Sequence, residues 1–136
     1  MKRIFLALAL ALPVCATAAP ALAIPYGQLA PADRYFGRMK MSILGIRNSI
    51  KDLSQAADNN PGESEHIFDK AVLVEDALRD WQQQFPRDPW IPKYAYSLAM
   101  LYQKLDYIDA RGRADAMIQW LDRRYPESEY AGVPRY

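Results

Sequence analysis

The sequence has little of the chemistry on which many enzymes and metalloproteins depend. Its 136 residues include one cysteine, Cys15, and one histidine, His66. This scarcity excludes most metal sites and most catalysis by a cysteine or histidine nucleophile. The chain also has no glycine-rich phosphate-binding loop and no serine-nucleophile motif. We therefore expect a protein that is not an enzyme and that carries no cofactor.

An excess of one charge and a long apolar run are missing too. The 17 lysines and arginines nearly balance 16 aspartates and glutamates, which removes the bulk attraction that nucleic-acid binding requires. The apolar run over residues 4–12 is shorter than the about 20 residues that span a bilayer. With 51% hydrophobic residues the chain is too apolar for a disordered protein, and its length predicts one domain.

Residues 1–23 are typical of a secretory signal peptide. Lys2 and Arg3 precede the apolar run, and the Ala-Leu-Ala of residues 21–23 supplies an A-x-A cleavage site. The Ala-Thr-Ala of residues 16–18 is a second such site, so cleavage after either one is compatible with the sequence.

Removal of the signal peptide changes the composition and net charge of the chain. Residues 24–136 contain 15 basic and 16 acidic residues and no cysteine, because Cys15 leaves with the signal. We expect a periplasmic or extracellular protein whose core, rather than any disulfide, holds it together. The alternative is a lipoprotein acylated on Cys15, although Val14 stands where bacterial lipoboxes have glycine, alanine or serine.

The remaining pattern predicts an all-α fold of four helices. Apolar side chains recur at intervals of three and four residues, the spacing of one buried helix face. No window alternates with period two, so strands are not expected. The predicted helices cover residues 32–57, 61–85, 91–106 and 109–125.

Short connections between these helices predict two antiparallel hairpins. The join between the third and fourth helices lacks glycine and proline, so one bent helix also fits that region. Gly37 and Gly45 lie within the first predicted helix. Either they allow a neighbouring helix to approach closely, or they have no special role.

The segment 81–90 recurs as 121–130, and each copy places an aromatic residue and a proline at a helix end. This offset of 40 residues is typical of stacked helical hairpins.

Residues 89–131 resemble a tetratricopeptide repeat. Residues 95–102 (Ala-x2-Leu-Ala-x2-Tyr) fit the pattern W-x2-L-G-x2-Y with alanine in place of tryptophan and glycine. Residues 114–118 (Ala-x3-Ile), followed by Pro126, fit A-x3-F…P, after three extra residues in the turn. Residues 123–131 are similar to repeat ends of periplasmic outer-membrane assembly and cell-division coordination proteins. The resemblance implies a TPR-like second hairpin that holds proteins or peptides.

Aromatic residues gather in the carboxy-terminal third, where seven of nine tyrosines lie. Aromatic side chains dominate binding hot spots, but tyrosine is also a common core residue. These tyrosines are therefore either core residues or the lining of a peptide-binding groove. The candidate partner-binding residues are Tyr94, Tyr102, Arg111 and Trp120.

Glu63 and His66 have the i, i+3 spacing of ligands in carboxylate-bundle metal sites, and Asp69 stands three residues further on. Such a site needs two Glu-x-x-His helices, whereas this chain has one such pair. The alternative is an exposed histidine in the first turn of a helix, beside acidic residues.

Acidic residues also follow one face of the second predicted helix, and segment 61–88 carries a formal charge of −4 against +2 for segment 24–60. These are either solvated faces that partly neutralise each other or an acidic docking surface for a basic partner. The acidic positions are Glu65, Asp69, Asp76 and Asp80.

Together these features predict an exported scaffold or adaptor module of the cell envelope that binds a protein or peptide. The alternative is a four-helix bundle carrying a small apolar ligand or cofactor in the periplasm, with the glycines of the first helix leaving room. Self-association is also predicted, because two hairpins are few for a free-standing helical repeat.

Overall fold

The computed structural model describes residues 29–132, and the predicted signal peptide, residues 1–23, lies outside the described residues. The predicted all-α class is confirmed. The helices are α1 (Ile43–Asn59), α2 (Ser64–Gln84), α3 (Trp90–Lys104) and α4 (Ile108–Arg124), with a short 3-10 helix η2 (Pro61–Glu63) and the strands β1 (Tyr35–Phe36) and β2 (Met41–Ser42).

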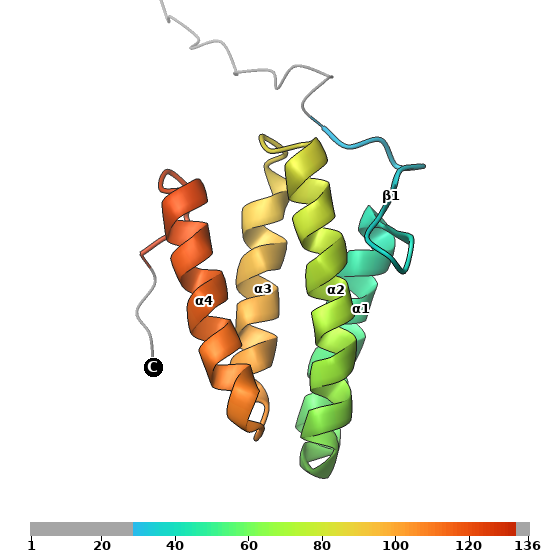
Figure 1. Ribbon diagram of the computed structural model, residues 1–136, viewed down its shortest axis with the longest axis vertical. Coiled ribbons are helices and arrows are strands. Elements are labelled where there is room, and N and C mark those ends of the chain that lie inside the picture. Colours follow the sequence, from blue (N-terminus) through green and yellow to red (C-terminus); the bar gives the residue numbers. More distant parts are fainter. Residues whose placement is uncertain (1–28, 133–136) are drawn as a thin grey trace, which may run out of the picture.

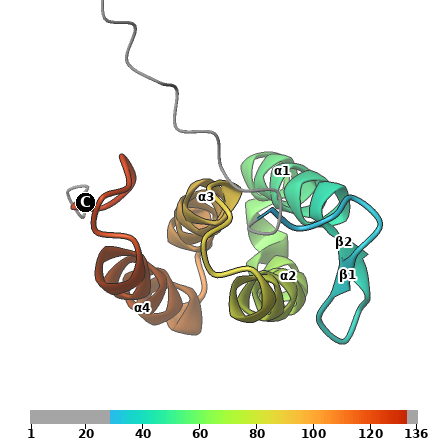
Figure 2. The same cartoon turned by 90° about the horizontal axis from the view of Figure 1, so that it is seen from above.

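The helices form two antiparallel hairpins that lie side by side (Figures 1 and 2). α3 packs against both helices of the first hairpin and against α4. Ala95 and Ala99 are fully buried on α3, and small side chains at this spacing let helix backbones approach closely. α3 and α4 are separate helices, because Leu105 and Tyr107 between them have extended backbones.

The predicted start of the first helix at residue 32 is wrong, as is the expectation of no strands. Tyr35 pairs with Ser42 in a two-stranded antiparallel sheet, and α1 begins only at Ile43. Gly37 and Lys40 have φ angles of +67° and +51°, which no helix accommodates. The Ser42 Oγ then accepts the Gly45 N–H at 3.0 Å and caps α1.

This β-hairpin packs against α1 and α2 on the side away from α3 (Figure 2). Phe36 is fully buried, with its ring centroid 5.9 Å from Trp81 and 6.1 Å from Phe85. A Cβ on Gly37 would lie 2.7 Å from the Cα of Ala77. Glycine is therefore required here both for its φ angle and for close approach to α2.

The 40-residue sequence repeat corresponds to two turns with the same hydrogen bonds. The Phe85 N–H donates to the Trp81 carbonyl, and the Tyr125 N–H donates to that of Leu121, both at 2.8 Å. Proline after each aromatic residue prevents the helix from continuing. The Tyr125 hydroxyl donates to the Pro86 carbonyl at 3.0 Å, so the two turns are in contact.

Candidate binding groove

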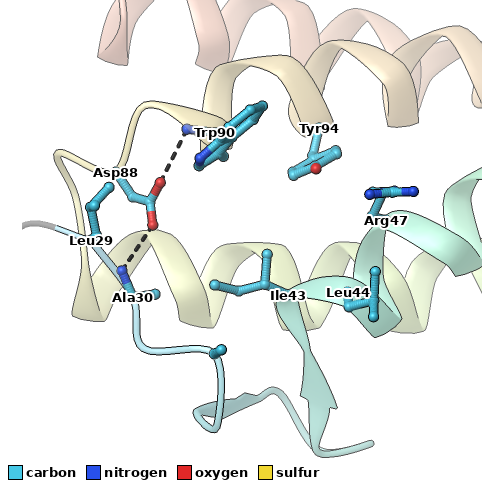
Figure 3. A pocket seen from close by; sticks show the side chains of 9 residues that line it. Leu29, Ala30, Ile43, Leu44, Arg47, Asp88, Trp90 and Tyr94 are labelled. Carbon is cyan, nitrogen blue, oxygen red and sulfur yellow. Dashed lines mark hydrogen bonds between the residues drawn. The ribbon is translucent and has the colours of Figure 1, made fainter.

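The surface between α1 and α3 contains two adjoining hollows, which we call the α1–α3 groove. Arg47, Trp90 and Tyr94 line both hollows, whose volumes are about 290 Å³ and 470 Å³. The remaining lining residues are Leu29, Ala30, Ala32, Ile43, Leu44 and Asp88 in the first hollow, and Ile50, Lys93 and Ser97 in the second. Figure 3 shows side chains from α1, α3 and the lead-in segment around the first hollow.

Large apolar side chains are exposed in this groove. Trp90 and Leu44 are 51% and 57% exposed, and they are two of the five large hydrophobic residues within 29–132 that are more than half exposed. They line the same hollow from different helices. Exposed apolar side chains that gather in one hollow mark interaction sites more often than scattered ones do.

The aromatic side of the groove is anchored in the core. The Trp90 and Tyr94 rings lie 6.5 Å apart with 22° between their planes, and the Tyr94 ring lies 5.9 Å from that of buried Trp81. Tyr94 thus connects the core to the exposed indole. Rigid aromatic side chains lose little conformational entropy when a partner binds.

Asp88 closes one end of the groove and is 1% exposed. Its carboxylate accepts hydrogen bonds from the N–H groups of Ala30 and Trp90, at 3.0 and 3.1 Å (Figure 3). It also accepts one from the indole N–H of Trp81 at 3.1 Å. These bonds fix the lead-in segment to the first turn of α3. Because this carboxylate is satisfied within the fold, its role is to shape the groove.

The charged groups on the groove rim are basic. The side chains of Arg47 and Lys93 make no ion pair within the described part of the chain. The Lys93 ammonium lies 5.6 Å from the centroid of the Trp90 ring, a cation–π geometry. Asp88 is the one carboxylate among the described lining residues. The groove therefore combines apolar surface with two cationic side chains that make no ion pair with the described residues.

An ion pair links α1 and α3 at their carboxyl ends. Both carboxylate oxygens of Asp58 accept from the Lys104 ammonium, at 2.8 and 2.9 Å. These side chains are 59% and 43% exposed, so the pair adds less than about 1 kcal/mol to stability. The cations Arg47 and Lys93 lie toward the opposite, amino-terminal ends of the same helices.

The four predicted partner-binding residues lie in different parts of the structure. Tyr94 lines the α1–α3 groove, whereas Tyr102 is fully buried, so for Tyr102 the core interpretation holds. Arg111 is exposed on α4. Trp120, also on α4, is half-buried under the Arg79 guanidinium, whose carbon lies 4.4 Å from the ring centroid.

Buried Tyr102 belongs to a polar network that joins α2, α3 and α4. Its hydroxyl and the Arg113 guanidinium donate to Oε2 of Glu75 at 3.0 and 2.9 Å. Arg79 donates to Oε1 at 3.1 Å. Burial, and then the negative charge of Glu75, raise the pKa of the Tyr102 phenol, so it stays a hydrogen-bond donor. This network stabilises the packing of the two hairpins.

Two of the four residues of the predicted acidic face, Asp76 and Asp80, bind the β-hairpin. The Gly37 N–H donates to Asp80 at 2.7 Å, and the Arg38 N–H donates to Asp76 at 2.9 Å. The backbone hydrogen bond from Gly37, and then the side-chain bond from Gln84, lower the pKa of the Asp80 carboxyl. The Arg38 guanidinium also lies 3.7 Å from the Asp76 carboxylate, so this half of the face contacts the β-hairpin, which favours partial neutralisation over an acidic docking surface.

The residues of the metal-site interpretation do not gather into a ligand set. Glu63 ends the 3-10 helix, and His66 and Asp69 are exposed on the first turns of α2. Within residues 29–132, no group of three or more histidine, cysteine, aspartate or glutamate side chains is placed to hold a metal ion.

Both glycines of the first predicted helix lie close to neighbouring atoms. Gly37 is in close contact with Ala77, and a Cβ on Gly45 would lie 3.3 Å from the Ser42 Oγ. Neither glycine therefore adds support to the small-ligand alternative, which stays a prediction.

Sequence reasoning missed several groove residues. Leu44 is apolar but lies off the buried stripe of α1, and Arg47 lies beside it on the exposed side of that helix. Trp90 was not among the predicted partner-binding residues, and only its position opposite α1 marks it as a groove residue. The off-stripe leucine is the one sequence signal that would have pointed here.

Comparison with known proteins yields no match among family models, curated proteins or solved structures. None of the helices between residues 29 and 132 is long and apolar enough to cross a membrane.

Proposed function

We propose that this protein is an exported, non-enzymatic binding module of the cell envelope that holds a segment of a partner protein in the α1–α3 groove. The observation that carries the proposal is the pair of exposed apolar side chains, Trp90 and Leu44, which line one hollow from two different helices. A clustered aromatic and aliphatic anchor is the usual centre of a binding hot spot.

The lining chemistry favours binding over catalysis. Apolar side chains make most of the hollow, and its carboxylate, Asp88, accepts three hydrogen bonds from the protein itself. A general base needs a free lone pair directed at its substrate. A rigid apolar surface with a polar rim suits recognition of a peptide segment.

The scaffold role and the cellular location rest on further features. The signal-like residues 1–23 support export. The packing of α3 against both helices of the preceding hairpin supports the tetratricopeptide-like interpretation, because stacked repeats bury their faces in this way. Self-association remains part of the proposal, to be measured by light scattering.

Affinity capture from cell envelopes tests the proposal by comparing the partner recovered by the wild type with that recovered by groove variants. Trp90→Ala and Leu44→Ala each truncate a side chain that is more than half exposed, so we expect both variants to retain the fold. The control is Ile108→Ala, which truncates a 90% exposed apolar side chain at the start of α4, outside the groove. We expect either groove variant to reduce recovery of the partner about tenfold or more.

Circular dichroism and light scattering of each variant exclude unfolding as the cause. Equal recovery of the same partner by Trp90→Ala, Leu44→Ala and the wild type would show that the groove is not the binding surface. Equal loss in Ile108→Ala would show that the effect is not specific to the groove.

A further inference from the structure

The charges around the α1–α3 groove are unbalanced. Arg47 and Lys93 border the same hollow and make no ion pair within residues 29–132. Lys51 follows Arg47 by one helical turn, is exposed, and likewise makes no ion pair with the described residues. Asp88, the carboxylate in the lining, is buried and accepts three hydrogen bonds.

Arg47 and Lys93 adjoin the exposed apolar side chains. Lys93 lies over the Trp90 ring, and Arg47 lines both hollows together with Trp90 and Tyr94. Figure 3 shows Arg47 and Tyr94 at one end of the first hollow and Leu29, Ala30 and Asp88 at the other. An apolar side chain seated against Trp90 would thus place a neighbouring residue of its own chain beside the cations.

We infer that the groove selects an acidic segment, in which a bulky apolar side chain is flanked by aspartate or glutamate. This inference rests on the proposed function and specifies the partner of the same site. The apolar side chain contacts Ile43, Leu44 and Trp90, and the flanking carboxylates pair with Arg47 and Lys93. Opposite charges at an interface rim speed association and reject partners of the wrong sign.

A short acidic segment fits better than an extended polyanion. Arg47 and Lys93 border one hollow, whereas α2 and its flanking turns, residues 61–88, carry a formal charge of −4. A nucleic acid or an anionic bilayer presents phosphates over a wide area, and such binding needs many basic contacts. A peptide with one or two carboxylates needs no more than these two cations.

Fluorescence anisotropy with three labelled nine-residue peptides tests the inference. The acidic peptide has tryptophan and leucine flanked by two glutamates, the basic peptide has lysine in place of each glutamate, and the polar peptide keeps the glutamates but has serine for the apolar pair. Amidated carboxyl ends remove the terminal charge. We expect the acidic peptide to bind about tenfold more tightly than either of the others.

Charge reversal of the rim supplies the matched test. In the double variant Arg47→Glu/Lys93→Glu the order of the acidic and basic peptides should invert. Arg123→Glu, a reversal on the exposed side of α4 outside the groove, should leave the order unchanged. Affinity of the wild type for the acidic peptide should fall with added salt, because the rim charges are solvent-exposed.

The failures of the two proposals are distinguishable. If acidic and basic peptides bind equally, and Trp90→Ala weakens both, the groove is the binding site but the inferred acidic chemistry is wrong. If the acidic peptide binds and Trp90→Ala leaves its affinity unchanged, the groove itself is not the site. No binding of the acidic peptide at about 1 mM overturns the inference, as does selective binding of phosphatidylglycerol vesicles.

Discussion

The indole N–H of Trp81 donates a 3.1 Å hydrogen bond to Oδ2 of Asp88, joining the last turn of α2 to the start of α3. The same carboxylate binds the N–H groups of Ala30 and Trp90. One buried side chain therefore connects the lead-in segment, α2 and α3. The position of Trp90 in the α1–α3 groove depends on this connection.

Asp88→Ala should lower the free energy of unfolding by about 3 kcal/mol, because it leaves the buried Trp81 N–H and two backbone N–H groups without their acceptor. Ser128 is the counterpart 40 residues on, and its Oγ accepts one bond, from the Tyr130 N–H. Ser128→Ala should cost about 1 kcal/mol. Urea denaturation measures both, and equal losses would contradict the role assigned to Asp88.

Gly37→Ala should lower the free energy of unfolding by about 2–4 kcal/mol, because the residue has φ +67° and its Cβ would collide with the α2 backbone. Gly112 is the matched control, since it lies within α4 and a Cβ there meets nothing within 4 Å. Gly112→Ala should raise stability by about 0.5–1 kcal/mol. Thermal unfolding followed by circular dichroism checks both signs, and a neutral Gly37→Ala would be inconsistent with the packing of the β-hairpin.

The Glu75 network predicts unequal effects for its members. Glu75→Ala should cost about 3 kcal/mol, because it leaves Tyr102 and two arginines without their shared acceptor in a largely buried site. Tyr102→Phe removes one hydrogen bond and should cost about 1 kcal/mol. Lys104→Ala, which breaks the exposed pair with Asp58, should cost less than about 1 kcal/mol. Denaturant titration measures the three losses in the free energy of unfolding. A loss for Lys104→Ala equal to that for Glu75→Ala would refute the predicted order.

The lowered pKa of Asp80 predicts how stability depends on pH. The ionised carboxylate accepts the Gly37 N–H in the folded state, so its contribution is complete above the unfolded pKa of about 3.9. That contribution is lost as the pH falls through the lower folded pKa. Melting temperatures between pH 6 and 2 should therefore fall less steeply in Asp80→Asn than in the wild type. Parallel curves would show that the Gly37–Asp80 bond does not stabilise the ionised form.

Periodicity predicted most of the fold because buried residues repeat along each helix. Ile46 and Ile50 are buried as the stripe requires. The predicted helix 32–57 also included Phe36 and Met39, because their spacing continues that of the buried residues although they lie in the β-hairpin. The positive φ of Gly37 and the Ser42 cap decide the conformation there, and a pattern of apolar residues does not contain that information.

The candidate site was less predictable because it depends on two helices distant in sequence. Leu44 on α1 and Trp90 on α3 share a hollow only after α3 packs against the first hairpin. Tyr94 and Tyr102 were both predicted to bind a partner, but Tyr94 is half-buried and lines the groove, whereas Tyr102 is fully buried and donates a hydrogen bond to Glu75. Residue type alone does not distinguish these two environments.

The most direct test of the α1–α3 groove is nuclear magnetic resonance of the ¹⁵N-labelled protein titrated with the acidic peptide. The account predicts that the largest shifts occur at the Trp90 indole and at the amides of Leu44, Arg47 and Tyr94, while the Trp120 indole on α4 stays unchanged. Largest shifts on α4, around Arg111 and Trp120, would contradict it.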